Sequence, residues 1–295
     1  LFGSLALLRL AAADVFDEHE YKALHRRRSE HVDDVRWTPA DVALLDDARE
    51  VLGPKPGKGG KIDEADEIRT FGHIVIDEVQ DLTPMQLKMA TRRSLNGSMT
   101  VVGDIAQATG ALAPDDWEDV LAHLPDRKPP RVIGLSVGYR IPSQIMTLAN
   151  RVMHAATPGL RAPESVRVGD AEPRMERVES RNQGVIAEVE RLRAELPTAS
   201  IAIVAPDDLC DDLSEALVAA GHPHGRAATA GLDQLLTVVP VSVVKGLELD
   251  AVIVVEPSQI VSDQEHGLRA LYVALTRPTQ RLSIVHTDDL PESLR

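Results

Sequence analysis

The sequence predicts an α/β fold with doubly wound parallel sheets. Short apolar runs rich in β-branched residues, such as residues 74–76 and 200–205, alternate with helical segments along most of the chain. Such runs are typical of strands buried on both faces, and their alternation with helices indicates a parallel sheet. In addition, the run 74–76 ends in two adjacent carboxylates, Asp77 and Glu78. Ligands bind beyond the carboxyl ends of such strands, so this is where a site is expected.

Residues 1–70 carry mostly helical signals and then a linker. Thr38 followed by Pro39 is typical of a helix start, and this helix should end at Gly53. Asp41 in the first turn favours the helix dipole.

Residues 53–61, GPKPGKGGK, predict a loop or flexible linker. They do not match a phosphate-binding loop, because Gly57-Lys58 is followed by Gly59 instead of Ser or Thr and no strand precedes them.

Residues 71–127 predict the C-terminal part of a first lobe. After the strand at 74–76, a helix should start at Thr83-Pro84, and Asn96-Gly97 should turn the chain into a strand at 100–102. A short helix is expected at 115–124. The stiff run 125–130, PDRKPP, is the predicted boundary between lobes.

Residues 128–295 predict a complete second lobe. The apolar and helical patterns place strands at 132–135, 200–205, 238–244, 251–255 and 281–286, and helices at 142–154, 184–196, 211–220 and 267–276.

Composition narrows the class of protein. Apolar residues make up 43% of 295 residues, and no apolar run is long enough to span a membrane. The apolar opening lacks a basic leader and an initial Met, so we expect an internal start rather than a signal peptide. The lone cysteine, Cys210, excludes an internal disulfide and a Cys-based zinc site, which suits a cytoplasmic protein.

The charge balance argues against a general nucleic-acid surface. The formal net charge is −14 and aromatic residues make up 3% of the chain. Sequence-independent binding needs Lys and Arg at phosphates, and single-strand binders use aromatic side chains as stacking platforms. We therefore expect nucleic-acid binding to be weak, although a local basic groove would escape this count.

Five motifs occur in a fixed order along the chain. They are DEVQD at 77–81, GDIAQ at 103–107, GYR at 138–140, VVKGLELD at 243–250 and LYVALTR at 271–277. Together they resemble the later motifs of the superfamily 1 helicases and translocases, which are UvrD/Rep-like ATPases with RecA-like lobes. The closest resemblance is to the HelD-like group, ATPases that act on bacterial RNA polymerase. The resemblance implies ATP and Mg²⁺ as cofactors and core RNA polymerase as a partner.

The resemblance also implies catalytic roles. Asp77 would order Mg²⁺, Glu78 would act as the general base toward water, and Gln107 would sense the γ-phosphate. From the second lobe, Arg140 and Arg277 would reach the γ-phosphate. The alternatives are a strand-end acid, a solvated loop glutamine and arginines tied to structural carboxylates.

Further residues would bind the nucleotide. Tyr139 matches the aromatic residue that stacks on the base, although it could equally be a core residue. Lys245-Gly246 would form a tight turn before Glu248, the acid that contacts the nucleotide.

Three departures shape the functional prediction. A phosphate-binding loop is missing from the sequence, so we expect this chain by itself to have little ATPase activity. Residues 108–117, ATGALAPDDW, replace the aromatic–Arg segment with which DNA helicases of this superfamily touch the single strand. The stretch 178–239 is too short for an inserted accessory domain.

These departures favour a motor that remodels RNA polymerase. The rival interpretations are a DNA helicase or translocase, and a non-catalytic interaction module with a degenerate nucleotide site.

Overall fold

The computed structural model describes residues 2–13, 15–54, 69–125, 128–227 and 234–295. The chain divides into two compact units, Leu1–Ile68 and Arg69–Arg295, which are described separately. Most of the predicted linker, including Gly57-Lys58-Gly59, lies outside the described residues. The predicted boundary at 125–130 includes two residues outside this set and stays a prediction.

The first unit consists of short helices. They are α1 (Leu5–Ala11), α2 (Glu18–Leu24) and α3 (Pro39–Leu52), with a 3₁₀ turn at Val32–Asp34. Helix α3 begins and ends as predicted, and Gly53 terminates it with a φ of +71°. Asp41 accepts hydrogen bonds from the Arg26 guanidinium and from the amide and hydroxyl of Thr38, which hold the pKa of Asp41 well below its usual range.

The second unit begins with a two-stranded parallel sheet, β1 (Ile74–Ile76) and β2 (Met99–Val101). Helix α4 (Pro84–Arg92) follows β1, and the turn before β2 contains Gly97 at a φ of +79°; the strand, helix and turn predictions here are confirmed. Helix α5 (Trp117–Leu121) is shorter than predicted. It starts late because Asp116 caps it by accepting hydrogen bonds from the next-turn amides of Glu118 and Asp119.

A six-stranded sheet forms the centre of the second unit. Its order is β5–β10–β9–β6–β8–β7, and every neighbouring pair is parallel. The strands are β5 (Arg174–Arg177), β6 (Ile201–Ala205), β7 (Gly225–Arg226), β8 (Leu236–Pro240), β9 (Leu249–Val255) and β10 (Pro278–His286). Strand β6 is buried at every position, as its continuous apolar run predicts.

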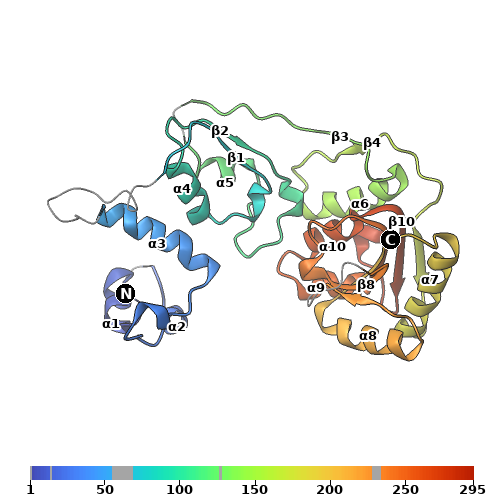
Figure 1. Ribbon diagram of the computed structural model, residues 1–295. Coiled ribbons are helices and arrows are strands. Elements are labelled where there is room, and N and C mark those ends of the chain that lie inside the picture. The colour runs from blue at the N-terminus through green and yellow to red at the C-terminus, as the bar shows by residue number, and fades with distance from the viewer. Residues whose placement is uncertain (1, 14, 55–68, 126–127, 228–233) are drawn as a thin grey trace. The chain divides into compact units, whose positions relative to one another are not determined.

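Helices cover both faces of this sheet (Figure 1). On one face lie α6 (Ser143–Ala156), α9 (Pro257–Asp263) and α10 (Gly267–Leu275), which pack on the even-numbered residues of β6 and β9. On the other lie α7 (Arg181–Glu195) and α8 (Cys210–Ala219), which pack on the odd-numbered residues of the same strands. The predicted doubly wound α/β class is therefore confirmed, and the arrangement is consistent with a RecA-like lobe.

Two strand predictions are wrong, one in the existence of the strand and one in its end. Residues 132–135 form no strand, and Val132, Ile133 and Leu135 are each more than 60% exposed. An apolar run becomes a strand only when a neighbour accepts its hydrogen bonds, and no described segment pairs with this one. A short pair follows instead, β3 (Val137–Gly138) with β4 (Glu164–Ser165).

The strand predicted at 238–244 ends early. Strand β8 stops at Pro240, which has no N–H for the ladder, and a 3₁₀ turn at Val241–Val243 continues the chain. Helix α9 and the edge strand β5 were not predicted. Among the described residues, no helix has the length and apolar character needed to cross a membrane.

Candidate functional site

The DEVQD motif leaves strand β1 through a strained residue. Glu78 has a φ of +50°, in the left-handed region that side chains other than glycine rarely adopt. The Asp77 carboxylate accepts a hydrogen bond from the Glu78 amide at 2.9 Å, which supports this turn. The Glu78 carboxylate, 55% exposed, is thereby turned outward at the end of the strand.

Gln80 joins the ends of β1 and β2. Its side chain is buried, donating to the Glu78 carboxylate at 2.6 Å and accepting from the Asp104 amide at 3.0 Å. Gln80 lies within DEVQD, but the sequence pattern predicts no role for it. Because one amide contacts both motifs, the two strand ends form a single structural unit.

The GDIAQ motif presents Gln107 toward the LYVALTR motif. The Asp104 carboxylate accepts from the Ala106 amide and from the Gln107 side chain at 2.8 Å. The side-chain oxygen of Gln107 accepts a hydrogen bond from Arg277 Nη2 at 2.9 Å. A predicted phosphate sensor and a predicted arginine finger therefore lie in direct contact.

Arg277 is buried where helix α10 gives way to strand β10. It is 4% exposed, and its Nε donates to the Val273 carbonyl at 3.0 Å. Burial lowers the pKa of Arg277, and the nearby Arg140 guanidinium lowers it further. The side chain is fixed by hydrogen bonds, which is how a cation is placed precisely in a low-dielectric site.

Lys245, from the VVKGLELD motif, bridges the DEVQD and GDIAQ motifs. Its ammonium donates to the Asp81 carboxylate at 2.5 Å and to the Gln107 carbonyl at 2.9 Å, and it lies 4.0 Å from the Glu78 carboxylate. Gly246 follows with a φ of +79°, which explains why glycine occupies this turn. Asp81 is a second residue of DEVQD for which the sequence pattern predicts no role.

Two further predicted residues, Arg140 and Glu248, form an ion pair. Arg140 Nη1 donates to the Glu248 carboxylate at 2.6 Å, and its Nη2 approaches the Thr276 carbonyl at 3.4 Å. Tyr139, beside it in the GYR motif, is 81% exposed and is not a core residue.

The structure thus brings Glu78, Gln107, Lys245 and Arg277 together in one cluster of contacts. Asp77 joins this cluster through its hydrogen bond with the Glu78 amide. Arg140 and Glu248 lie next to this group through Thr276. The roles of all these residues stay predictions.

The side chains of this site would hold a metal ion only together with oxygen atoms of a bound phosphate or of water. Among the described residues, no three His, Cys, Asp or Glu side chains lie close enough to hold a metal on their own. Magnesium sites typically use one or two carboxylates, with water and phosphate oxygens completing the shell. Asp77 uses Oδ1 for the Glu78 amide, and no hydrogen bond to its Oδ2 is seen within the described part of the chain, so the side chain fits this role.

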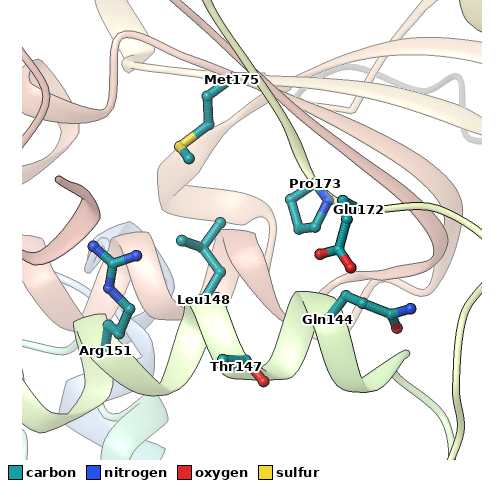
Figure 2. A pocket seen from close by; sticks show the side chains of 7 residues that line it. All are labelled: Gln144, Thr147, Leu148, Arg151, Glu172, Pro173 and Met175. Carbon is teal, nitrogen blue, oxygen red and sulfur yellow. The ribbon is translucent and has the colours of Figure 1, made fainter.

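A hollow of about 210 Å³ lies between helix α6 and the chain around β5 (Figure 2). Figure 2 shows Leu148 and Met175 facing each other across it. Its lining contains none of the predicted site residues and consists of Gln144, Thr147, Leu148, Arg151, Glu172, Pro173 and Met175.

Comparison with known families identifies one stretch. Residues 235–285 match the UvrD-like helicase C-terminal domain. This stretch contains the VVKGLELD and LYVALTR motifs, so the match supports a superfamily 1 helicase family and leaves the HelD-like group untested. No curated protein matches the sequence significantly.

Two solved structures are similar in part. The C-terminal domain of a possible DNA helicase from Lactobacillus plantarum WCFS1 is 25% identical, with a TM-score of 0.42, over 53% of this chain and 92% of that one. Arterivirus nonstructural protein 10, a helicase, is 16% identical, with a TM-score of 0.42, over 87% of this chain and 53% of that one.

Proposed function

We propose that the chain is the catalytic C-terminal portion of an ATP-hydrolysing superfamily 1 motor of the HelD-like kind, which remodels or recycles bacterial RNA polymerase. The observation that carries the motor proposal is the 2.9 Å contact between Gln107 and Arg277. It joins a motif beyond strand β2 to the motif at the end of helix α10, which packs on the six-stranded sheet, beside the exposed Glu78 carboxylate. A site divided in this way can convert hydrolysis into relative movement of its parts.

Each side chain has a chemical task in this proposal. Glu78 orients a water molecule and accepts its proton. Gln107 can donate to a phosphate oxygen or accept from that water, because an amide does both. Arg277 and Arg140 stabilise charge on the transferred phosphoryl group, where one arginine contributes roughly 10³–10⁵ in rate. Bound through Asp77, Mg²⁺ would neutralise charge on the phosphate oxygens.

Three observations support polymerase over DNA as the partner. The net charge of −14 repels a phosphate backbone, and aromatic residues make up 3% of the chain. Residues 108–117 lack the aromatic–Arg pair that would contact a single strand. An acidic protein suits the basic nucleic-acid channel of a polymerase.

A DNA helicase or translocase is the second candidate, favoured by the match to the UvrD-like helicase domain. The exposed Tyr139 offers an aromatic face on which a base can stack in that case. A non-catalytic interaction module with a degenerate site is the third.

Two binding measurements in one buffer at physiological salt distinguish the polymerase motor from the DNA helicase or translocase. We expect the chain to retain core RNA polymerase in a pull-down and to bind a labelled single-stranded oligonucleotide weakly by fluorescence anisotropy. Tyr139→Ala serves as the matched variant and should leave polymerase retention unchanged. Submicromolar DNA binding that Tyr139→Ala weakens, without polymerase retention, would show that the protein acts on DNA instead.

A further inference from the structure

Arg269 is a buried cation outside the predicted site. It lies in the first turns of helix α10 and is 6% exposed. Its Nη2 donates to the Asp115 carboxylate at 2.9 Å, and its Nη1 donates to the Pro114 carbonyl at 3.0 Å and approaches the Ala108 carbonyl at 3.5 Å. One guanidinium therefore contacts both ends of the segment 108–115.

This contact should be hard to break. A charged group removed from water is costly unless it is paired and hydrogen-bonded. Asp115 supplies the one ion pair of Arg269 seen in the described part of the chain, and that carboxylate is itself 85% exposed. The segment must stay docked on helix α10 for the guanidinium to keep its partners.

Helix α10 is also linked to Gln107, the residue just before the segment 108–115. Arg277 follows the end of α10, about two helical turns from Arg269, and donates to the Gln107 side chain. Gln107 directly precedes Ala108. One helix thus fixes the Gln107 amide at one end and the chain that follows Gln107 at the other.

Helix α10 is also unable to shift alone. All of its residues except Leu268 are buried, and a Cβ at Gly267 would overlap the Val261 carbonyl of helix α9. A backbone packed so closely behaves as one body with its neighbours. A change in the register of 108–115 against α10 would therefore pull on Gln107, which Arg277 holds beyond the far end of the same helix.

We propose that Arg269 and Asp115 form a clasp that positions Gln107 against Arg277. Arg269 acts here as a positioning residue and contacts no reacting group. The inference rests on the proposed function for the role of Gln107, but its geometry can be tested without nucleotide. The clasp would make the segment 108–115 follow helix α10, in place of the strand-contacting segment of DNA helicases.

The test compares Asp115→Asn, Asp115→Glu and Arg269→Gln with Glu118→Gln in the complete chain. Glu118 is also exposed, and no ion pair of its carboxylate is seen in the described residues, so it controls for loss of one negative charge. Hydrogen exchange reports on the Gln107, Ala108 and Ala113 amides, which donate to the carbonyls of Asp104, Ile105 and Gly110. The Gln107 side-chain amide signal in a nitrogen–proton NMR spectrum reports on its contact with Asp104.

We expect Asp115→Asn and Arg269→Gln to speed exchange of these amides about tenfold, equivalent to about 1.4 kcal/mol, and to shift or broaden the Gln107 signal. Asp115→Glu should restore both readouts toward parental values, while Glu118→Gln should leave them unchanged. Exchange in strand β6 serves as the folding control. If Arg269→Gln fails to fold, Asp115→Asn alone decides the outcome.

The proposal fails if Asp115→Asn changes exchange less than twofold, or if it speeds exchange while the Gln107 signal stays parental. The second result would mean that the ion pair only stabilises a loop. Neither readout uses ATP or polymerase, so the clasp can stand if the proposed function fails, and the reverse also holds.

Discussion

At the scale of single residues, Gly103 shows how closely the two site loops approach. A Cβ placed on Gly103 would overlap the Gln80 side-chain oxygen and lie 2.8 Å from Val79 Cγ1. Gln80 is buried and bonded to the Asp104 amide, so it has little freedom to withdraw. The glycine in GDIAQ is therefore required by the packing of DEVQD against it.

We expect Gly103→Ala to reduce the free energy of unfolding by about 1–3 kcal/mol, the usual cost of overpacking a fixed core. Denaturant unfolding measures this difference. Gly110→Ala is the matched control, because a Cβ there meets nothing within 4 Å. Equal stabilities for the two variants would show that Gln80 moves aside freely and does not link the strands.

The residues of the site could be predicted better than their contacts. The motifs indicated Glu78, Gln107, Lys245 and Arg277, and the structure brings these four together. The links made by Gln80 and Asp81 are side-chain contacts between distant segments, which neither periodicity nor spacing encodes. Arg269 had a weaker signal still, a charged residue in an otherwise apolar helix.

At the scale of elements, Asp250 ties three strands of the sheet together at their starts. From strand β9 it accepts hydrogen bonds from the Ser200 amide at 2.8 Å, the Ser200 hydroxyl at 3.0 Å and the Gln280 side chain at 2.7 Å. Burial raises the pKa of Asp250, but these hydrogen bonds lower it more, so it lies below the usual value.

The lowered pKa predicts a pH dependence. A carboxyl whose folded pKa is depressed stabilises the fold above its unfolded pKa of about 3.9, and this contribution is lost as pH falls through the folded pKa. We expect Asp250→Asn to lower the free energy of unfolding by about 1–2 kcal/mol at pH 7. The difference from the parent should shrink below about pH 4.

Chemical unfolding at a series of pH values measures this difference, with the exposed Asp208→Asn as the control. A gap between Asp250→Asn and the parent that stays constant down to pH 2 would contradict the assignment.

The predicted elements succeeded where local pattern and tertiary pairing agree. The run that became β6 is apolar throughout and has neighbours on both sides in the sheet. Residues 132–135 have a similar composition, but no described strand pairs with them. Strand β5, with the sequence RMER, could not be predicted because its polar composition gives no strand signal and its position depends on pairing with β10.

At the scale of the whole molecule, the net charge of −14 makes a prediction about salt. Opposite potentials speed the encounter of two macromolecules, and salt screens them over about 8 Å at physiological ionic strength. We expect the association rate of the chain with core RNA polymerase to fall at least severalfold between 50 and 300 mM salt, values chosen to span that screening range. The dissociation rate should change less, because it depends on contacts already formed.

Single-stranded DNA should behave differently, because few phosphates are neutralised and few counterions are released. Its binding should stay weak at each salt concentration, with a shallow dependence on salt. Biosensor kinetics for polymerase and anisotropy titrations for DNA, run in the same buffers, measure both. A steep salt dependence for DNA, with polymerase association independent of salt, would place a basic groove on this acidic chain and favour the DNA helicase over the polymerase motor.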